Sequence, residues 1–295
     1  MDESTKGTIS IVTAFFLWGI FPVYWKALQH VSSTQILAHR VVWSLVFVLV
    51  LLSIQRRWNE AKTAMSLYHN VPIFLVTSFL LGGNWLIYIW AVNSNQIVEA
   101  CLGYFINPLV NVCLGMVFLR ERLYRLQIIS VLLAFAGVLC LTLQYGRLPW
   151  IALVLAVTFG IYGLLRKTAR AESMVGLLLD TGFLAPIFLV YLIFLAAHGS
   201  GALVSINLRT DVLLIGAGVV TAVPLLLFAY GARRIRYSTV GFLQYIAPTG
   251  QLLIGVFLYR EQFTRAHAIA FGLVWVALLV YSTSTFMTYK RRVPP

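Results

Sequence analysis

The chain has 295 residues, of which 60% are hydrophobic and 11% are charged, and its formal net charge is +13. A water-soluble protein carries about 25% charged residues because its surface faces water, so most of this surface must face lipid. The basic residues lie in short clusters between apolar runs, which is typical of membrane topology signals, so nucleic acid is not an expected partner.

Apolar runs long enough to form membrane-spanning helices, about 20 residues each, recur from one end of the chain to the other. The sequence predicts an all-α polytopic membrane protein with ten transmembrane helices, and the lipid bilayer is its first expected partner. The helices are expected at residues 7–27, 34–54, 71–92, 97–118, 126–144, 148–166, 175–196, 211–231, 237–258 and 266–286.

The lysines and arginines indicate the direction of these helices, because cytoplasmic loops carry most such residues. With the N-terminus inside, 16 of the 22 fall in inner segments and 5 in outer segments, while Arg40 lies within a span. Both termini are therefore predicted to be cytoplasmic. An odd number of spans would destroy this separation of charge.

The chain matches itself at a shift of 140 residues, and the match divides it into two units, residues 1–146 and 147–295. Each unit would hold five spans, and because five is odd, the second unit would cross the membrane in the opposite sense. Inverted repeats of this kind are typical of secondary transporters, although a purely structural duplication would leave the same pattern. The identical pairs are Ile106/Ile246, Pro108/Pro248, Gly115/Gly255, Arg120/Arg260, Glu121/Glu261 and Arg125/Arg265.

Seven segments carry a resemblance to a known family: residues 18–26 (WGIFPVYWK), 39–44 (HRVVWS), 82–86 (GGNWL), 90–93 (WAVN), 99–111 (EACLGYFINPLVN), 162–167 (YGLLRK) and 241–248 (GFLQYIAP). At these positions the sequence resembles the drug/metabolite transporter superfamily, and in particular the RarD-type permeases of its EamA family. The resemblance implies that each unit is an EamA repeat and that the protein lies in the bacterial inner membrane. It also implies a central substrate cavity lined by the first four helices of each half, and peripheral fifth helices that would support a homodimer if the protein is not a monomer.

The resemblance implies a class of transport without a particular substrate, since related proteins export amino acids and other metabolites and RarD-type permeases are associated with chloramphenicol sensitivity. We therefore expect a secondary exporter of small metabolites, such as amino acids or amphipathic drugs like chloramphenicol, that works by alternating access. An intramembrane enzyme or an accessory subunit acting on lipid-linked substrates is the alternative. Since the sequence holds no nucleotide-binding or enzyme motif and no metal-ligand spacing, no catalytic residue, metal or cofactor is expected.

Five ionisable residues within or at the ends of predicted spans are candidates for function, because a charge at the centre of a membrane helix costs about 2.5–3.5 kcal/mol. Arg40 and Asp180 lie 140 residues apart, so they would occupy equivalent positions and could form an ion pair. Lys26 would meet an anionic group of the substrate, or extend to the membrane interface. His39, Glu99 and Asp180 are candidates for a coupling proton. The alternatives are that Glu99 caps a helix and that His39 is a polar wall residue that does not titrate.

Amide side chains coincide with a proline in both halves, which suggests a polar and bendable centre. We expect Pro108 and Pro248 to act as hinges, because proline removes a helical hydrogen bond. The nearby amides would line the substrate cavity or, alternatively, link helices to one another. Aromatic side chains would supply the apolar part of the cavity wall unless they only mark the membrane interface. The amide candidates are Asn84, Asn107, Asn111, Gln244 and Gln251, and the aromatic candidates are Trp85, Tyr104 and Tyr245.

Overall fold

Helices make up every regular element in the residues that the computed structural model describes, which are 2–66, 70–118, 125–146, 148–168, 173–232, 234–235 and 243–292. In chain order the elements are α1 (Glu3–Lys26), α2 (Ser33–Ile54), α3 (Trp58–Ser66), α4 (Asn70–Asn93), α5 (Ile97–Phe118), α6 (Arg125–Tyr145), α7 (Trp150–Thr168), α8 (Ser173–Ala197), α9 (Leu208–Ala232), α11 (Ile246–Leu253), the π-helix η1 (Ile254–Leu258) and α12 (Arg265–Arg292).

Eight of these helices are long and apolar enough to cross a membrane: α1, α2, α4, α5, α6, α8, α9 and α12. Two shorter apolar stretches, Trp150–Arg166 in α7 and Ile246–Leu258 in α11 and η1, coincide with the predicted spans 148–166 and 237–258. Residues 237–242, at the start of the second of these, lie outside the described part of the chain. The polytopic α-helical architecture is therefore confirmed, whereas the number ten stays a prediction.

The sequence did not predict α3, a nine-residue helix within the connection between the second and third expected spans. It buries Ala61 and Ala64 on one face and exposes Trp58 and Met65. A spacing of three residues between the buried positions is typical of an amphipathic helix that lies on a surface. At nine residues it is too short to cross a bilayer.

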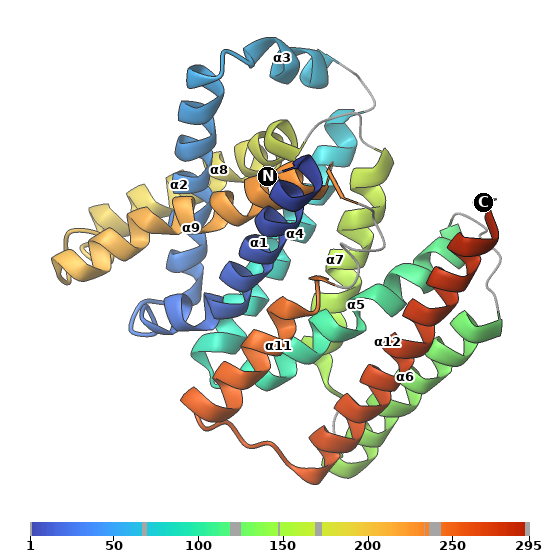
Figure 1. Ribbon diagram of the computed structural model, residues 1–295. Coiled ribbons are helices and arrows are strands. Elements are labelled where there is room, and N and C mark those ends of the chain that lie inside the picture. The colour runs from blue at the N-terminus through green and yellow to red at the C-terminus, as the bar shows by residue number, and fades with distance from the viewer. Residues whose placement is uncertain are drawn as a thin grey trace.

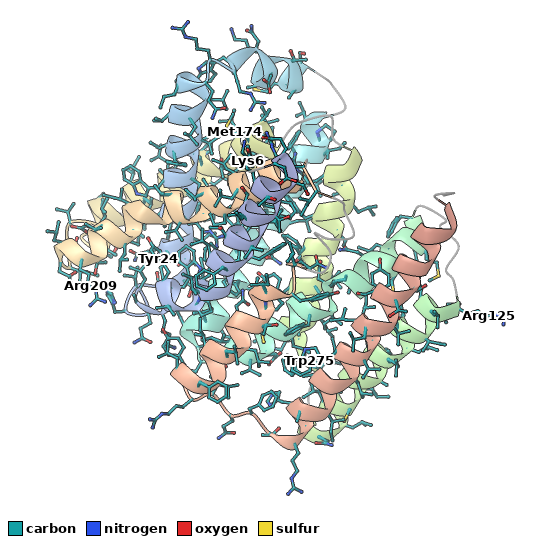
Figure 2. The ribbon with its side chains drawn as sticks, viewed as in Figure 1. Lys6, Tyr24, Arg125, Met174, Arg209 and Trp275 are labelled. Atoms are coloured by element: carbon teal, nitrogen blue, oxygen red, sulfur yellow. The ribbon has the colours of Figure 1, made fainter. Side chains whose placement is uncertain are left out.

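The outer surfaces of the long helices are apolar, as lipid contact requires. Phe135 and Leu143 of α6 are 64% and 74% exposed, and Val190 of α8 is 68% exposed. Large apolar side chains exposed on several helices indicate contact with lipid or another protein rather than water. The side chains in Figure 2 extend from helices in all directions, with Arg125 and Arg209 at the periphery.

Long-range packing arranges the helices in two groups (Figure 1). Helices α6 and α12 lie side by side at one edge of the molecule. In the larger group, α2 packs against α8 and α9, α1 packs against α9 and α11, α4 packs against α7 and α8, and α5 packs against α7. Helix α5 also contacts α6 and α12, so it joins the two groups.

Two of these interfaces depend on glycine because the backbones approach closely. A Cβ atom at Gly218 of α9 would overlap the carbonyl carbon and oxygen of Trp43 in α2. A Cβ atom at Gly103 of α5 would lie 2.7 Å from the carbonyl oxygen of Ala152 in α7. Small residues permit this kind of approach between membrane helices, where close packing replaces the hydrophobic effect as the driving force.

Candidate functional site

The centre of the larger group holds a buried cation, Arg40 of α2, which is 4% exposed. Its Nε donates a hydrogen bond of 2.9 Å to Thr221 Oγ1 of α9. Its Cζ lies 4.8 Å from the ring centroid of Trp25 in α1 and 4.0 Å from that of Trp85 in α4. Four helices therefore meet at one guanidinium, and the two indoles stabilise it by cation–π attraction of up to about 2 kcal/mol each in a desolvated setting.

The predicted ion pair between Arg40 and Asp180 is wrong for this conformation, because each residue has other partners. Asp180 of α8 is fully buried and accepts hydrogen bonds from Thr77 Oγ1 at 2.5 Å and from the Tyr162 hydroxyl at 3.1 Å. The cation that acts on this carboxyl group is Arg166 of α7. Asp180 thus joins α4, α7 and α8, while Arg40 joins α1, α2, α4 and α9.

The side chain of Arg166 lies between α7 and α8. A Cβ atom at Gly176, one turn before Asp180, would overlap the Arg166 guanidinium, so the absence of a side chain there makes room for the cation. The Cζ of Arg166 also lies 4.8 Å from the ring centroid of Phe74. The sequence placed Arg166 in an inner charge cluster and did not predict its contact with the buried acid.

His39 lies beside Arg40 on α2, and it is 3% exposed. Its Nδ1 has no hydrogen-bond partner among the described residues. The ring is therefore buried, and its role as a coupling residue stays a prediction.

The amides link helices in this conformation, which is the alternative to lining a cavity. Asn84 Nδ2 donates to the Leu155 carbonyl oxygen and to Thr158 Oγ1 of α7, at 3.0 and 2.9 Å. Asn107 Nδ2 donates to the carbonyl oxygen of Ala156, also in α7, at 3.0 Å. Amides in hydrocarbon need such partners, because an unsatisfied polar group there is costly.

The remaining amides and prolines lie along α5 and α11. Asn111 Nδ2 donates to Asn107 Oδ1 at 3.2 Å, and Gln251 Nε2 donates to the Trp18 carbonyl oxygen of α1 at 3.1 Å. Pro108 lies within α5 and Pro248 within α11, as predicted, and their action as hinges stays a prediction. Gln244 precedes α11 and is partly exposed.

The three aromatic candidates do not form one wall. Trp85 stacks on Arg40. Tyr104 packs edge-on against Tyr88 at 5.7 Å between ring centroids, and it lies near Arg40. Tyr245 instead stacks on Phe105, in the cluster that joins α5 to α12. Two of the three therefore belong to the surroundings of Arg40.

Lys26 and Glu99 both stabilise helix ends. Lys26 Nζ donates to the carbonyl oxygens of Val92 and Asn93 at 3.1 and 3.3 Å, and to Asn95 Oδ1 at 2.6 Å. A cation at a helix C-terminus complements the partial negative charge of the last carbonyls. Glu99 Oε1 accepts a hydrogen bond of 3.1 Å from the Ile151 backbone amide, so it caps the start of the neighbouring helix α7.

Glu261 has a similar role that the sequence did not predict. Its two carboxylate oxygens accept hydrogen bonds of 2.8 Å from the backbone amides of Ile97 and Val98, the first residues of α5. Burial raises the pKa of the Glu261 carboxyl, and these two hydrogen bonds together with Lys26 counteract part of that effect. The connection between η1 and α12 is thereby attached to the start of α5.

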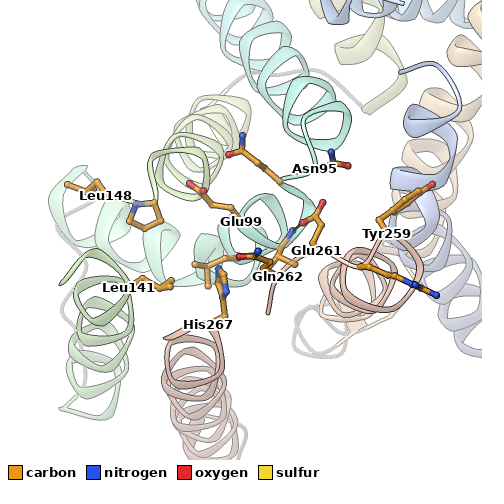
Figure 3. A pocket seen from close by; sticks show the side chains of 13 residues that line it. Asn95, Glu99, Leu141, Leu148, Tyr259, Glu261, Gln262 and His267 are labelled. Atoms are coloured by element: carbon orange, nitrogen blue, oxygen red, sulfur yellow. Dashed lines mark hydrogen bonds between the residues drawn. The ribbon is translucent and has the colours of Figure 1, made fainter. Parts of the chain in front are cut away.

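A cavity of about 500 Å³ lies at this end of the molecule, between α5, α12 and the ends of α6 and η1 (Figure 3). Glu99 and Glu261 lie on its wall together with His267, and both carboxylates are already bonded to helix N-termini. The cavity therefore lies beside the helix N-termini that Glu99 and Glu261 cap. Among the described residues, several buried polar atoms without a hydrogen-bond partner lie instead at Arg40, His39 and Trp25.

Comparison with known proteins decides the family. The EamA-like transporter family matches residues 5–143. Protein RarD of Escherichia coli (strain K12) is 43% identical over 98% of both chains, and the uncharacterized transporter YojE of Bacillus subtilis (strain 168) is 46% identical over 96% of this chain and 95% of its own. This chain belongs to the EamA family.

The likeness to RarD-type members that the sequence indicated is therefore confirmed, and this EamA-family protein is a multi-span membrane protein of a transporter family. One crystal structure of a protein, 18% identical, superposes on 98% of this chain and 99% of its own with a TM-score of 0.62. That likeness concerns the fold alone. It extends over both halves of the chain, whereas the family match covers the first half.

Proposed function

We propose that this EamA-family protein is a secondary exporter of small metabolites, in which two inverted repeats of five helices alternate access to a site between them. The repeats would pair α1 with α7, α2 with α8, α4 with α9, α5 with α11 and η1, and α6 with α12. The protein would lie in the bacterial inner membrane with both termini in the cytoplasm, as a monomer or a homodimer. Amino acids and amphipathic drugs such as chloramphenicol are the first solutes to examine.

The helix packing is the observation that best supports this proposal. Under the pairing above, the contact of α5 with α7 corresponds to that of α11 with α1. In the same way, α4 with α8 corresponds to α9 with α2, and α4 with α7 corresponds to α9 with α1. The contacts of α2 with α8 and of α6 with α12 correspond to themselves. Two halves related by a twofold axis in the membrane plane require this correspondence.

The prolines of α5 and α11 support the alternating part of the proposal. Pro108 and Pro248 occupy equivalent places, and the π-helix η1 begins a few residues after Pro248. A π-helical turn and a proline both interrupt the regular ladder of backbone hydrogen bonds, and such turns are frequent at functional sites. The two equivalent helices are therefore suited to bend.

Transport by purified protein in proteoliposomes tests the function. We expect at least one solute from a panel of labelled amino acids and chloramphenicol to enter vesicles that contain the protein and not empty vesicles. If one proton exchanges for one solute, a gradient of one pH unit corresponds to about 1.4 kcal/mol and to about tenfold accumulation. Failure of every solute to move, with or without the gradient, would contradict the proposal.

The inversion of the repeats is tested by cysteine accessibility. In a chain whose three native cysteines are replaced, Arg260→Cys is expected to react with an impermeant thiol reagent added to intact cells. Arg120→Cys, its equivalent in the first repeat, is expected to react only after the cells are opened. Arg120 lies outside the described residues, so this prediction rests on the sequence match. Labelling of both variants from the same side would rule out opposite orientations.

A further inference from the structure

Several buried hydrogen-bond donors around Arg40 have no acceptor among the described residues. The Arg40 Nη1, the Trp25 indole Nε1 and the Tyr88 hydroxyl are all buried, and none has a hydrogen-bond partner in the part of the chain that the structure describes. No carboxylate among the described residues pairs with Arg40 either, since Asp180 is bonded to Thr77 and Tyr162. A buried cation surrounded by free donors is suited to an anion supplied from outside the chain.

The guanidinium is held in a fixed orientation. Its Nε is bonded to Thr221 Oγ1 at 2.9 Å, and the rings of Trp25 and Trp85 lie within 5 Å of its Cζ. These contacts leave Nη1 free to donate. A planar guanidinium presents parallel donors that match the two oxygens of a carboxylate, and a lysine cannot reproduce this geometry.

Aromatic rings surround the same point. Tyr88 and Tyr104 lie near Arg40 and pack edge-on against each other, and Tyr104 continues toward Phe159 of α7, with 6.4 Å between ring centroids. Together with Trp25 and Trp85 they would contact the apolar or aromatic body of a bound molecule. Lys26, the other candidate cation for an anionic group, is already bonded to the end of α4.

We propose that the solute is a carboxylate with an apolar or aromatic body, and that Arg40 binds its carboxylate with help from the Trp25 indole and the Tyr88 hydroxyl. This inference rests on the proposed transport function and narrows its substrate class. Amino acids and related organic acids fit the site, whereas an uncharged drug such as chloramphenicol lacks the anionic group that Arg40 requires. The site is closed in this conformation, so the solute would enter when the helices around it separate.

Binding to detergent-solubilised protein tests the inference with matched pairs of probes. Benzoate, phenylacetate and N-acetylphenylalanine would each be compared with the corresponding carboxamide by calorimetry and by shifts in thermal unfolding. For the wild-type chain we expect at least one carboxylate to bind about tenfold or more tightly than its amide. Equal affinity for all three pairs would overturn the inference without any variant.

Variants of Arg40 provide a second test of this inference. Arg40→Gln is expected to abolish the preference for the carboxylate, and Arg40→Lys to reduce it, because lysine keeps the charge and loses the paired donors. Arg209→Gln, at an exposed position on α9 (Figure 2), is the matched control and is expected to keep the wild-type preference. A preference that persists in a folded Arg40→Gln variant would also overturn the assignment.

The two proposals fail in different ways. If the protein moves only neutral solutes and Arg40→Gln leaves that flux unchanged, the proposal of secondary transport is supported and the proposal of a carboxylate site is contradicted. If a carboxylate binds in a manner that depends on Arg40 but no solute crosses the vesicle membrane, the proposal of a carboxylate site is supported and the proposal of transport is contradicted.

Discussion

Replacing Asp180 with asparagine is expected to uncouple solute transport from the proton gradient. Asp180 is fully buried and is held by Thr77 and Tyr162, with Arg166 as the neighbouring cation. A charged carboxylate inside hydrocarbon is energetically costly, and the group becomes neutral when it binds a proton. Binding and release of a proton at this position therefore change the electrostatics of the whole site. Asparagine keeps the size and the oxygen that accepts from Thr77, but it cannot take up a proton.

The measurement is solute accumulation in proteoliposomes as a function of the imposed pH gradient. For the wild-type protein, accumulation should rise by about tenfold for each pH unit if one proton exchanges for one solute. For Asp180→Asn the slope should fall to zero, while exchange of labelled for unlabelled solute continues. Asp211→Asn is the matched control, since Asp211 lies in the first turn of α9 and bonds to the Val204 backbone amide near the surface.

An unchanged slope in Asp180→Asn would contradict the assignment of the coupling role to this residue. The two other candidates are less suited to it. Glu99 is occupied with the Ile151 backbone amide at the start of α7. His39 is buried in α2, and its Nδ1 has no hydrogen-bond partner among the described residues.

The helices were predictable because each expected span is a continuous apolar run, and lipid imposes a minimum length on such runs. The short α3 was not predicted, because its nine residues contain no long apolar run. The π-helix η1 was not predictable either, because Ile254–Leu258 reads as an ordinary apolar segment. Local sequence determines the spans, and packing determines their irregularities.

The buried ionisable residues were predictable from the cost of charge in lipid, but their partners were not. The shift of 140 residues related Arg40 to Asp180 and suggested an ion pair. In the structure, the partners of Arg40 are the rings of Trp25 and Trp85 and the hydroxyl of Thr221. Equivalent positions in two repeats face each other only when they lie close to the axis, and no feature of the sequence gives their distance from it.

Glu261 illustrates a limit of the same kind. Its partners, the backbone amides of Ile97 and Val98, lie more than 160 residues away in the chain. A local N-cap follows a spacing of two or three residues that can be recognised in a sequence. A cap supplied from the other half has no such spacing, so the sequence showed Glu261 only as one member of a repeated Arg-Glu pair.

Gly218→Ala is expected to destabilise the protein and to disturb the Arg40 site at the same time. The added Cβ would overlap the Trp43 carbonyl and lie 2.7 Å from the Ser44 backbone nitrogen, and backbone atoms cannot move aside as a flexible side chain could. Helices α2 and α9 would have to separate. Overpacking of this kind costs about 1–3 kcal/mol, which exceeds the gain of up to about 1 kcal/mol from replacing glycine by alanine in a helix.

The same displacement reaches Arg40 because of helical spacing. Ser44 lies one turn after Arg40 on α2, and Thr221 lies one turn after Gly218 on α9. The close approach at Gly218 therefore holds Thr221 at 2.9 Å from the Arg40 Nε, and separation of the two helices would break that hydrogen bond. We expect a lower thermal unfolding temperature together with weaker solute binding.

Gly272→Ala in α12 is the matched control, since a Cβ atom there would meet no other atom within 4 Å. That variant is expected to unfold at the wild-type temperature or slightly above it, because alanine favours the helix. Both variants would be compared by thermal unfolding in the same detergent. Equal stability of Gly218→Ala and the wild type would mean that α2 and α9 do not approach each other as closely as the Gly218–Trp43 contact requires.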